Sequence, residues 1–340
     1  MAPRDPKVRQ PDGAILVAQE IARSYGERLA LRSLSFSLRR GRVLGFLGPN
    51  GAGKTTAIRV LTTILEPTAG RFEVDGIGSE HPVEIRRRIG VLPEGLGFPR
   101  NTSGIDYLTY FGELFGRPGH AARRTGYELL AEVGLQNRAE SLVGTYSHGM
   151  RQRLGIARAL VNEPRVVFLD EPTLGLDPRG QQELLAMIQR IARERNAGVV
   201  LSSHLLDVIE DICDDVVIMN AGRVVAKGTV AEVIGASATE GGHQNVLRIR
   251  VPAALIGSAQ GILERSPGAG AVSVADAVGG WISTEIGGPG DRESATPEID
   301  RIRNAVLAAL IAADIPIIEV ETGGGRLQDV FLQLTAEAIV

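Results

Sequence analysis

Hydrophobic and polar positions follow one another along this chain in two patterns. Short, uninterrupted apolar runs at 43–47, 166–169, 199–201 and 216–219 are typical of buried strands. The segments between them carry apolar residues at helical spacing. Strands that alternate with helices in this way predict an α/β domain with a parallel sheet over residues 14–236.

A helical segment interrupts this alternation after Asn101. Its apolar residues recur at helical spacing in two stretches, Ile105-Leu108-Phe111-Leu114-Phe115 and Tyr127-Leu130-Val133. A further helix is indicated after Ser147. We therefore predict a helical subdomain at about 101–160, inserted into the α/β domain.

The pattern restarts in a different form near the C-terminal end. Residues 1–13 are polar and predict a flexible tail, and 237–245 are small and polar like a linker. From there to 340 we expect a separate small α+β domain. Its predicted elements have the β-α-β-β-α-β order of the ferredoxin-like fold, followed by a terminal helix. They are the strand 246–251, the helix 252–265, the strands 271–275 and 280–286, the helix 297–313, the strand 315–321 and the helix 326–338.

Composition narrows the possible partners. The chain has 340 residues, 44% of them hydrophobic, and a formal net charge of −3, so no nucleic-acid partner is expected. Cys213 is the only cysteine, which favours a reducing, cytoplasmic compartment. No apolar run is long enough to span a bilayer, so we expect any association with a membrane to go through a partner.

The most specific motif lies directly after the apolar run 43–47. It fits the phosphate-loop pattern G-x-x-x-x-G-K-S/T, and a helix is predicted to follow it. The backbone N–H groups of such a loop surround phosphate oxygens, the Lys reaches the β- and γ-phosphates, and the hydroxyl that follows binds Mg²⁺. The predicted nucleotide-binding residues are Gly48, Pro49, Asn50, Gly51, Ala52, Gly53, Lys54, Thr55 and Thr56.

Two acidic residues end the apolar run 166–169. Asp170 at the end of a strand suits the second Mg²⁺ contact of a phosphate-loop protein, and Glu171 suits a carboxylate that orients the attacking water. Two surface acids would be the simpler interpretation without the phosphate loop upstream. Shortly before this strand, Ser147 stands where an N-cap is expected, at the start of a basic amphipathic helix.

These motifs, in this order, resemble the nucleotide-binding subunits of ATP-binding cassette (ABC) transporters over residues 14–236. Residues 146–150 correspond to the family's signature Leu-Ser-Gly-Gly-Gln, in which Ser147 and Gly149 match, whereas Tyr146, His148 and Met150 differ. The variant with His and Met is similar to ABC-2-type exporters. The C-terminal segment 325–335 resembles the closing segment of the same exporters, whose relatives expel antibiotics.

The resemblance implies roles for further residues. Tyr25 would stack on adenine, and His204 would hold the γ-phosphate and the attacking water as a second catalytic residue beside Glu171. Ser147, Gly149, Met150 and Asp177 would contact nucleotide across a homodimer. Glu94, where the family usually has Gln, would ligate Mg²⁺ together with Thr55 and Asp170.

The resemblance also implies partners and a location. The chain would bind ATP with Mg²⁺, form a homodimer, and power export through a separate membrane permease from the cytoplasmic face of the membrane. The permease would dock on the helical subdomain near 94–107.

Two other classes remain possible on the sequence alone. One is a soluble ABC ATPase that acts on ribosomes or DNA, although such proteins usually carry two cassettes or a long coiled coil. The other is a phosphate-loop switch or kinase without transport, which would have no use for the signature and His204 together. Neither the transported molecule nor the direction of transport can be read from these residues.

Overall fold

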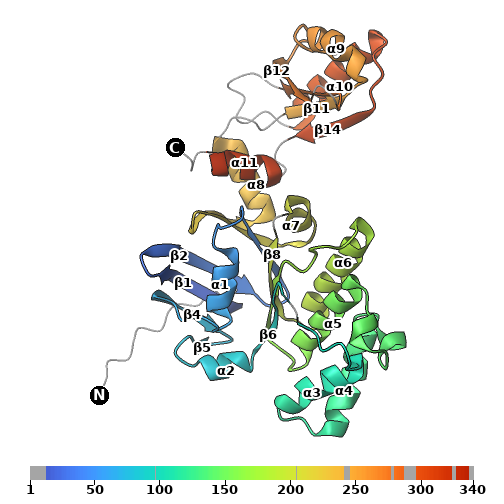
Figure 1. Ribbon diagram of the computed structural model, residues 1–340. Helices are drawn as coiled ribbons and strands as arrows, with labels where there is room; N and C mark the ends of the chain where they lie inside the picture. Colours follow the sequence, from blue (N-terminus) through green and yellow to red (C-terminus); the bar gives the residue numbers. More distant parts are fainter. Residues whose placement is uncertain are drawn as a thin grey trace. The chain divides into compact units, whose positions relative to one another are not determined.

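The computed structural model describes residues 13–95, 97–203, 205–240, 246–276, 279–286, 296–323 and 327–336 (Figure 1). The chain divides into two compact units, Met1–Val230 with Phe331–Val340, and Ala231–Val330. The predicted tail, apart from Gly13, lies outside the described residues, and so do 241–245 of the predicted linker. Residues 237–240, which were also predicted as linker, belong to a helix instead.

In the described part of the first unit, ten strands form one sheet in the order β5-β4-β1-β2-β10-β9-β3-β8-β7-β6. The strands are β1 (Ala14–Tyr25), β2 (Arg28–Arg39), β3 (Val43–Leu47), β4 (Ala69–Val74), β5 (Ile77–Gly78), β6 (Ile89–Leu92), β7 (Val166–Asp170), β8 (Gly198–Ser203), β9 (Asp215–Asn220) and β10 (Arg223–Thr229). The α-helices that accompany them are α1 (Lys54–Leu61), α2 (Pro82–Arg86), α3 (Gly104–Leu114), α4 (Gly119–Glu132), α5 (His148–Leu160), α6 (Pro178–Glu194) and α7 (Leu206–Ile212).

Only one end of this sheet, from β9 to the edge strand β6, is parallel throughout. Strands β6, β7, β8, β3 and β9 pair in parallel, as the alternating pattern predicted. Strands β1, β2, β4 and β5 are antiparallel, which the prediction of a parallel sheet did not include. Strands β1 and β2 are antiparallel because only a tight turn joins them. Tyr25 and Arg28, at the two ends of this turn, pair directly. A parallel connection needs roughly a dozen residues or more, and this turn has no room for one.

Helices cover both faces of the parallel strands. Figure 1 shows α1 on one side, between these strands and the antiparallel part, and α5 and α6 on the other. Phe46 packs on the α1 side in a core that includes Ile58 and Phe168. Its neighbour Gly45 points to the opposite side, where a Cβ would lie 2.7 Å from Ile209 Cδ1. A side chain at Gly45 would therefore push α7 away from the sheet.

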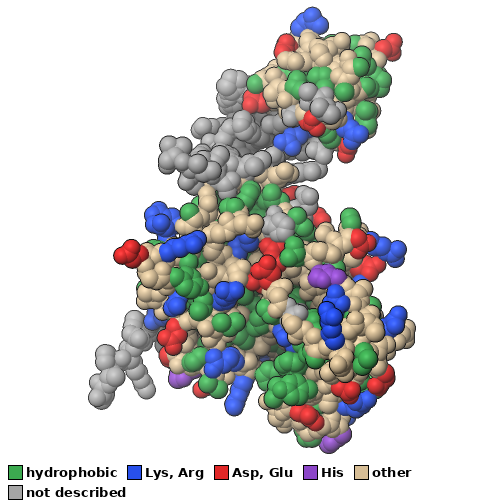
Figure 2. Space-filling view, viewed as in Figure 1, with side chains coloured by type: hydrophobic (Ala, Val, Ile, Leu, Met, Phe, Trp, Pro, Cys, Tyr) green, Lys and Arg blue, Asp and Glu red, His purple; other side chains and the backbone are tan. Residues whose placement is uncertain are grey.

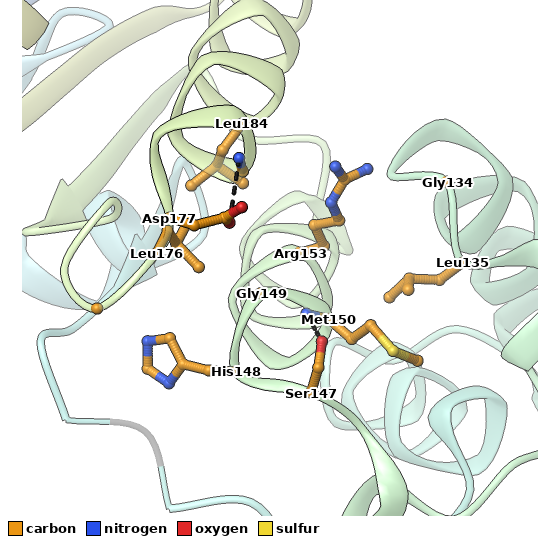
Figure 3. A pocket seen from close by; sticks show the side chains of 12 residues that line it. Gly134, Leu135, Ser147, His148, Gly149, Met150, Arg153, Leu176, Asp177 and Leu184 are labelled. Atoms are coloured by element: carbon orange, nitrogen blue, oxygen red, sulfur yellow. Dashed lines mark hydrogen bonds between the residues drawn. The ribbon is translucent and has the colours of Figure 1, made fainter.

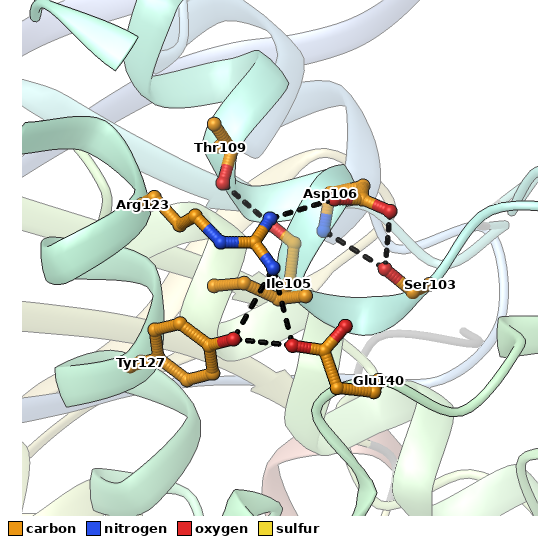
Figure 4. A network of polar contacts seen from close by, with 7 residues as sticks. All are labelled: Ser103, Ile105, Asp106, Thr109, Arg123, Tyr127 and Glu140. Atoms are coloured by element: carbon orange, nitrogen blue, oxygen red, sulfur yellow. Dashed lines mark hydrogen bonds and ion pairs between the residues drawn. The ribbon is translucent and has the colours of Figure 1, made fainter. Parts of the chain in front are cut away.

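The predicted helical subdomain contains α3, α4 and α5, with short 3-10 turns at Gln136–Arg138 and Val143–Thr145. Its helices are joined by polar contacts (Figure 4). Arg123 on α4 donates to Asp106 on α3 at 2.9 Å and to Glu140 at 3.1 Å. Ser103 caps α3 by accepting the N–H of Asp106 at 3.1 Å. These bonds set the spacing of α3 and α4.

The second unit has its own core and a four-stranded sheet among its described residues, in the order β12-β13-β11-β14. All three strand pairs are antiparallel, and the elements follow the β-α-β-β-α-β order. They are β11 (Val246–Arg250), the 3-10 turn Ala253–Leu255, α9 (Ile256–Leu263), β12 (Ala269–Asp276), β13 (Trp281–Ile286), α10 (Thr296–Ala312) and β14 (Glu319–Gly323).

The last strand of this unit begins at Glu319, later than the predicted 315–321, and Ile315 is buried in the core before the strand starts. Helices α8 (Val230–Glu240) and α11 (Leu327–Ala336) cross the division between the two units.

Candidate functional site

The carboxyl ends of four parallel strands meet at one edge of the large sheet. Leu47 at the end of β3 pairs with Ser203 on β8, Ser202 pairs with Asp170 on β7, and Leu169 pairs with Leu92 on β6. The residues that follow these strands are the phosphate loop, Glu171 and the segment with Glu94. Ligands of open α/β sheets bind at this edge. His204 follows β8 but lies outside the described residues, so its predicted role is not tested.

The phosphate loop is shaped by close packing against its neighbours. A Cβ on Gly48 would lie 2.4 Å from the Met219 carbonyl oxygen, and one on Gly53 would lie 2.9 Å from the Ala30 carbonyl oxygen. Gly53 also has a φ of +107°, which disfavours any side chain. The Ala52 carbonyl accepts the Gly222 N–H at 3.0 Å. Strands β2 and β9 and the turn before β10 thus fix the loop from outside.

Lys54 lies inside this loop. Its side chain is only 7% exposed, and its Nζ donates to the Gly48 carbonyl at 2.6 Å and to that of Pro49 at 3.4 Å. Burial lowers the pKa of Lys54, while the charges of Glu171, Asp170 and Glu94 act in the opposite direction. Lys54 is therefore a buried ammonium within the electrostatic reach of all three predicted carboxylates.

Ser202 joins the two acidic residues at the end of β7. Its hydroxyl donates to Asp170 Oδ1 at 2.6 Å and accepts the N–H of Glu171 at 3.0 Å. Ser202 is fully buried and Asp170 nearly so. Glu171 has a φ of +49°, an uncommon conformation for a residue with a side chain. The structure therefore holds Glu171 in a constrained position beside Asp170.

The predicted metal ligands supply only oxygen atoms. Thr55 lies on the first turn of α1, Asp170 ends β7, and Glu94 follows β6 and is exposed. In the described parts of the chain, no group of three or more His, Cys, Asp or Glu side chains could hold a metal by itself. A hydroxyl and carboxylates fit Mg²⁺, which takes few protein ligands and completes its shell with phosphate and water.

Tyr25 lies at the end of β1 with 42% of its surface exposed. The guanidinium of Arg23 lies 5.3 Å from the centre of the Tyr25 ring and donates to the Glu66 carbonyl at 2.7 Å. Arg23 Nε is buried without a hydrogen-bond partner. One face of the Tyr25 ring is thus supported by a cation.

The signature residues lie at the start of α5 and line an open pocket of about 550 Å³ (Figure 3). Ser147 caps α5 by accepting the Met150 N–H at 3.2 Å. Asp177 lies on the far side of the pocket and caps α6 by accepting the Gly180 N–H at 3.3 Å. The structure thus brings together four predicted residues, Ser147, Gly149, Met150 and Asp177. They line a pocket that includes no residue of the phosphate loop, and two capped helix starts bound it.

Two features of this site were not predicted. They are the hydroxyl of Ser202 beside Asp170 and the guanidinium of Arg23 beside Tyr25. A serine two residues before the predicted switch histidine, on a strand beside Asp170, could have pointed to Ser202. The spacing of Arg23 and Tyr25 could have pointed to their contact, because side chains two positions apart on a strand lie on the same face.

A phosphate loop on the parallel part of a mixed sheet, with Asp and Glu at the end of a nearby strand, defines a phosphate-loop nucleotide hydrolase. The model of the family described as "ABC transporter" matches residues 31–174. The daunorubicin resistance ATP-binding protein DrrA3 of Streptomyces coeruleorubidus is 35% identical over 320 residues, covering 92% of this chain and 93% of that protein. The chain belongs to the family of ABC transporter ATP-binding proteins.

Further similarities agree with this assignment. The bacitracin transport ATP-binding protein BcrA of Bacillus licheniformis is 40% identical over 212 residues, 62% of this chain and 68% of that protein. A solved ATP-binding subunit of an ABC transporter superposes with a TM-score of 0.59 at 30% identity, over 67% of this chain and 93% of that one. In the described part of this chain, we find no helix with the length and apolar character needed to cross a bilayer.

Proposed function

We propose that this chain is the ATP-hydrolysing subunit that powers export of a drug-like or lipid-like molecule through a separate ABC-2-type permease. The observation that supports hydrolysis best is the convergence of Lys54, Asp170 and Glu171 at one sheet edge. Support for export comes from relatives named for resistance to daunorubicin and for bacitracin transport.

The residues at the sheet edge divide the chemistry among them. Lys54 and the N–H groups of the phosphate loop bind and orient the phosphates of ATP. Glu171 holds the attacking water in line and takes its proton. Tyr25 stacks on adenine with Arg23 behind it. The switch residue His204 would contact the γ-phosphate.

Thr55, Asp170 and Glu94 would hold Mg²⁺. Their hydroxyl and carboxylate oxygens are the ligands that this ion prefers. When bound, Mg²⁺ would neutralise charge that develops on the β- and γ-phosphates. Ser202 would keep the Asp170 carboxylate in position for this contact.

The signature pocket supports action as a homodimer. Its Ser147 N-cap directs the positive end of α5 toward the open pocket, where a phosphate would be stabilised. Lys54 and the phosphate loop do not line this pocket. The phosphate would therefore belong to ATP that is bound by the phosphate loop of a second copy. ATP would then hold two copies together, and hydrolysis would release them.

The permease would contact the helical subdomain at the cytoplasmic face of the membrane. Figure 2 shows hydrophobic side chains gathered on the surface over α3. Tyr110 and Leu114 on this helix are 57% and 62% exposed. Exposed apolar patches of this kind mark interaction sites. Leu114→Arg should therefore abolish co-purification with the permease and leave ATP hydrolysis by the isolated chain unchanged.

Glu171→Gln tests the proposed hydrolysis. We expect turnover to fall about 100-fold or more, since the general base is lost, while ATP binding is retained and an ATP-bound dimer accumulates. Glu163→Gln is the matched control, because Glu163 also has a φ of +49° but lies away from the site. Size-exclusion chromatography with ATP and phosphate release would measure both effects. Wild-type turnover in Glu171→Gln would refute the role of Glu171.

A further inference from the structure

We propose that His148 couples the two nucleotide sites of the dimer, by tying the signature to the loop that carries Glu171. His148 acts here as a positioning residue. The inference rests on the proposed function, because it assumes that the signature receives the nucleotide of a second copy. The family pattern has Gly at this place, which has no side chain to make the connection.

A hydrogen bond makes the link. His148 is the first residue of α5, directly after the N-cap Ser147. Its Nε2 lies 2.8 Å from the carbonyl oxygen of Leu174. A carbonyl oxygen only accepts, so Nε2 carries the proton and donates it.

Close packing supports this link independently. Gly175 has a φ of +76°, and a Cβ there would lie 3.3 Å from His148 Nε2. A Cβ on Gly149 would lie 3.3 Å from Leu176 Cδ2. The loop therefore rests on the first turn of α5 at two neighbouring points, and Figure 3 shows His148 and Leu176 on the same side of the pocket.

The loop carries the connection on to Glu171. The N–H of Leu174 donates to the Glu171 carbonyl at 3.2 Å, and that of Leu176 donates to the Thr173 carbonyl at 3.2 Å. These two turns connect Leu174, which His148 binds, with Glu171, the proposed general base. The Glu171 N–H is in turn bound by Ser202. A shift of α5 on binding the second copy's nucleotide would therefore move the backbone of Glu171.

The consequence is cooperativity between the two sites. ATP bound by one copy would contact the signature of the other, and His148 would align Glu171 in that other copy's own site. Loss of the hydrogen bond should leave each site able to bind ATP. The same loss should reduce the rate of ATP hydrolysis and its cooperativity between the two sites.

The test compares His148→Phe with His148→Gln in the full chain. Phe keeps the ring without the donor, whereas Gln places an N–H donor at a similar reach. We expect His148→Phe to lower kcat about 3- to 10-fold, the range of one hydrogen bond, and to bring the Hill coefficient for ATP toward one. The Kd for ATP of the monomer should stay within about twofold. His148→Gln should restore both kcat and the Hill coefficient.

His120→Phe is the matched control, since His120 is an exposed histidine on α4, outside the lining of this pocket. Equal kcat and Hill coefficients in His148→Phe and wild type would overturn the inference, as would a Gln variant no better than Phe. A wild-type chain that hydrolyses no ATP would overturn the proposed function and the inference with it. Cooperative hydrolysis that is unchanged in His148→Phe would overturn the inference alone.

Discussion

The phosphate-loop edge and the signature pocket differ in how completely one chain builds them. At the edge, Lys54, Asp170 and Ser202 are buried, and each hydrogen-bonds within the chain. In the pocket, Ser147 and His148 are exposed, and the space between α5 and α6 is open. The difference indicates that a single copy has what it needs to bind ATP. On the proposed function, the signature contributes when a second copy of the chain covers it.

Among the variants that test the difference between these two regions, we expect Lys54→Met to have the largest effect. It removes the only ammonium of the phosphate loop, and ATP binding by the monomer should weaken about 100-fold, the loss expected for charge-assisted hydrogen bonds to phosphate. Lys227→Met is the control, because Lys227 donates to the Ser35 carbonyl at 3.0 Å on the exposed surface. Equilibrium binding of a fluorescent ATP analogue would measure both. Equal Kd values for Lys54→Met and wild type would mean that ATP binds elsewhere.

Ser147→Ala should separate the two regions. We expect kcat to fall about 10-fold, because the cap and its hydroxyl are lost at the dimer contact, with ATP binding by the monomer unchanged. Ser103→Ala removes a cap of the same kind from α3 and should leave kcat intact. Phosphate release and ATP titration of each variant give the comparison. Weaker monomer binding in Ser147→Ala would show that the pocket serves the chain's own nucleotide.

Ser202→Ala tests how the buried edge is held. Asp170 Oδ1 and the Glu171 N–H would both lose a partner, which should lower the free energy of unfolding by about 1–3 kcal/mol. In addition to this loss of stability, we expect the kcat of the folded protein to fall several-fold. Its affinity for nucleotide in the absence of Mg²⁺ should stay unchanged. Ser203→Ala is the control, because Ser203 is equally buried and its hydroxyl accepts the Leu205 N–H at 3.0 Å. If the two variants have equal kcat, Ser202 has only a structural role.

Arg23→Met should have the smallest effect. Without the cation behind it, the Tyr25 ring should bind adenine about two- to fivefold more weakly, in line with an exposed cation–π contact. Arg123→Met removes a similar contact, in which the guanidinium lies 5.4 Å from the Tyr127 ring, and should leave ATP affinity unchanged. Isothermal titration with ATP would resolve this difference. An unchanged Kd in Arg23→Met would remove Arg23 from the site.

Features that depend on neighbouring residues in the chain were predictable. The phosphate loop, the strand that ends in Asp170, and the Ser147 cap each follow from a short stretch of residue types, and the structure has each at its predicted place. The antiparallel strands β1 and β2 were not predicted, because apolar runs do not reveal the direction of a partner strand. The role of Ser202 was missed for a related reason, since its partners lie about thirty positions away in the sequence.

The sequence by itself determined the family, and it pointed to the candidate nucleotide-binding residues, because both depend on local spacing and on residue chemistry. Only the tertiary structure decided that Lys54 is buried and feels the charges of Glu171, Asp170 and Glu94, that Ser202 joins Asp170 to Glu171, and that His148 reaches Leu174. Strand register and helix packing bring these groups together across long stretches of chain. No local pattern of residues carries that information, since each contact depends on where two distant segments lie in the fold.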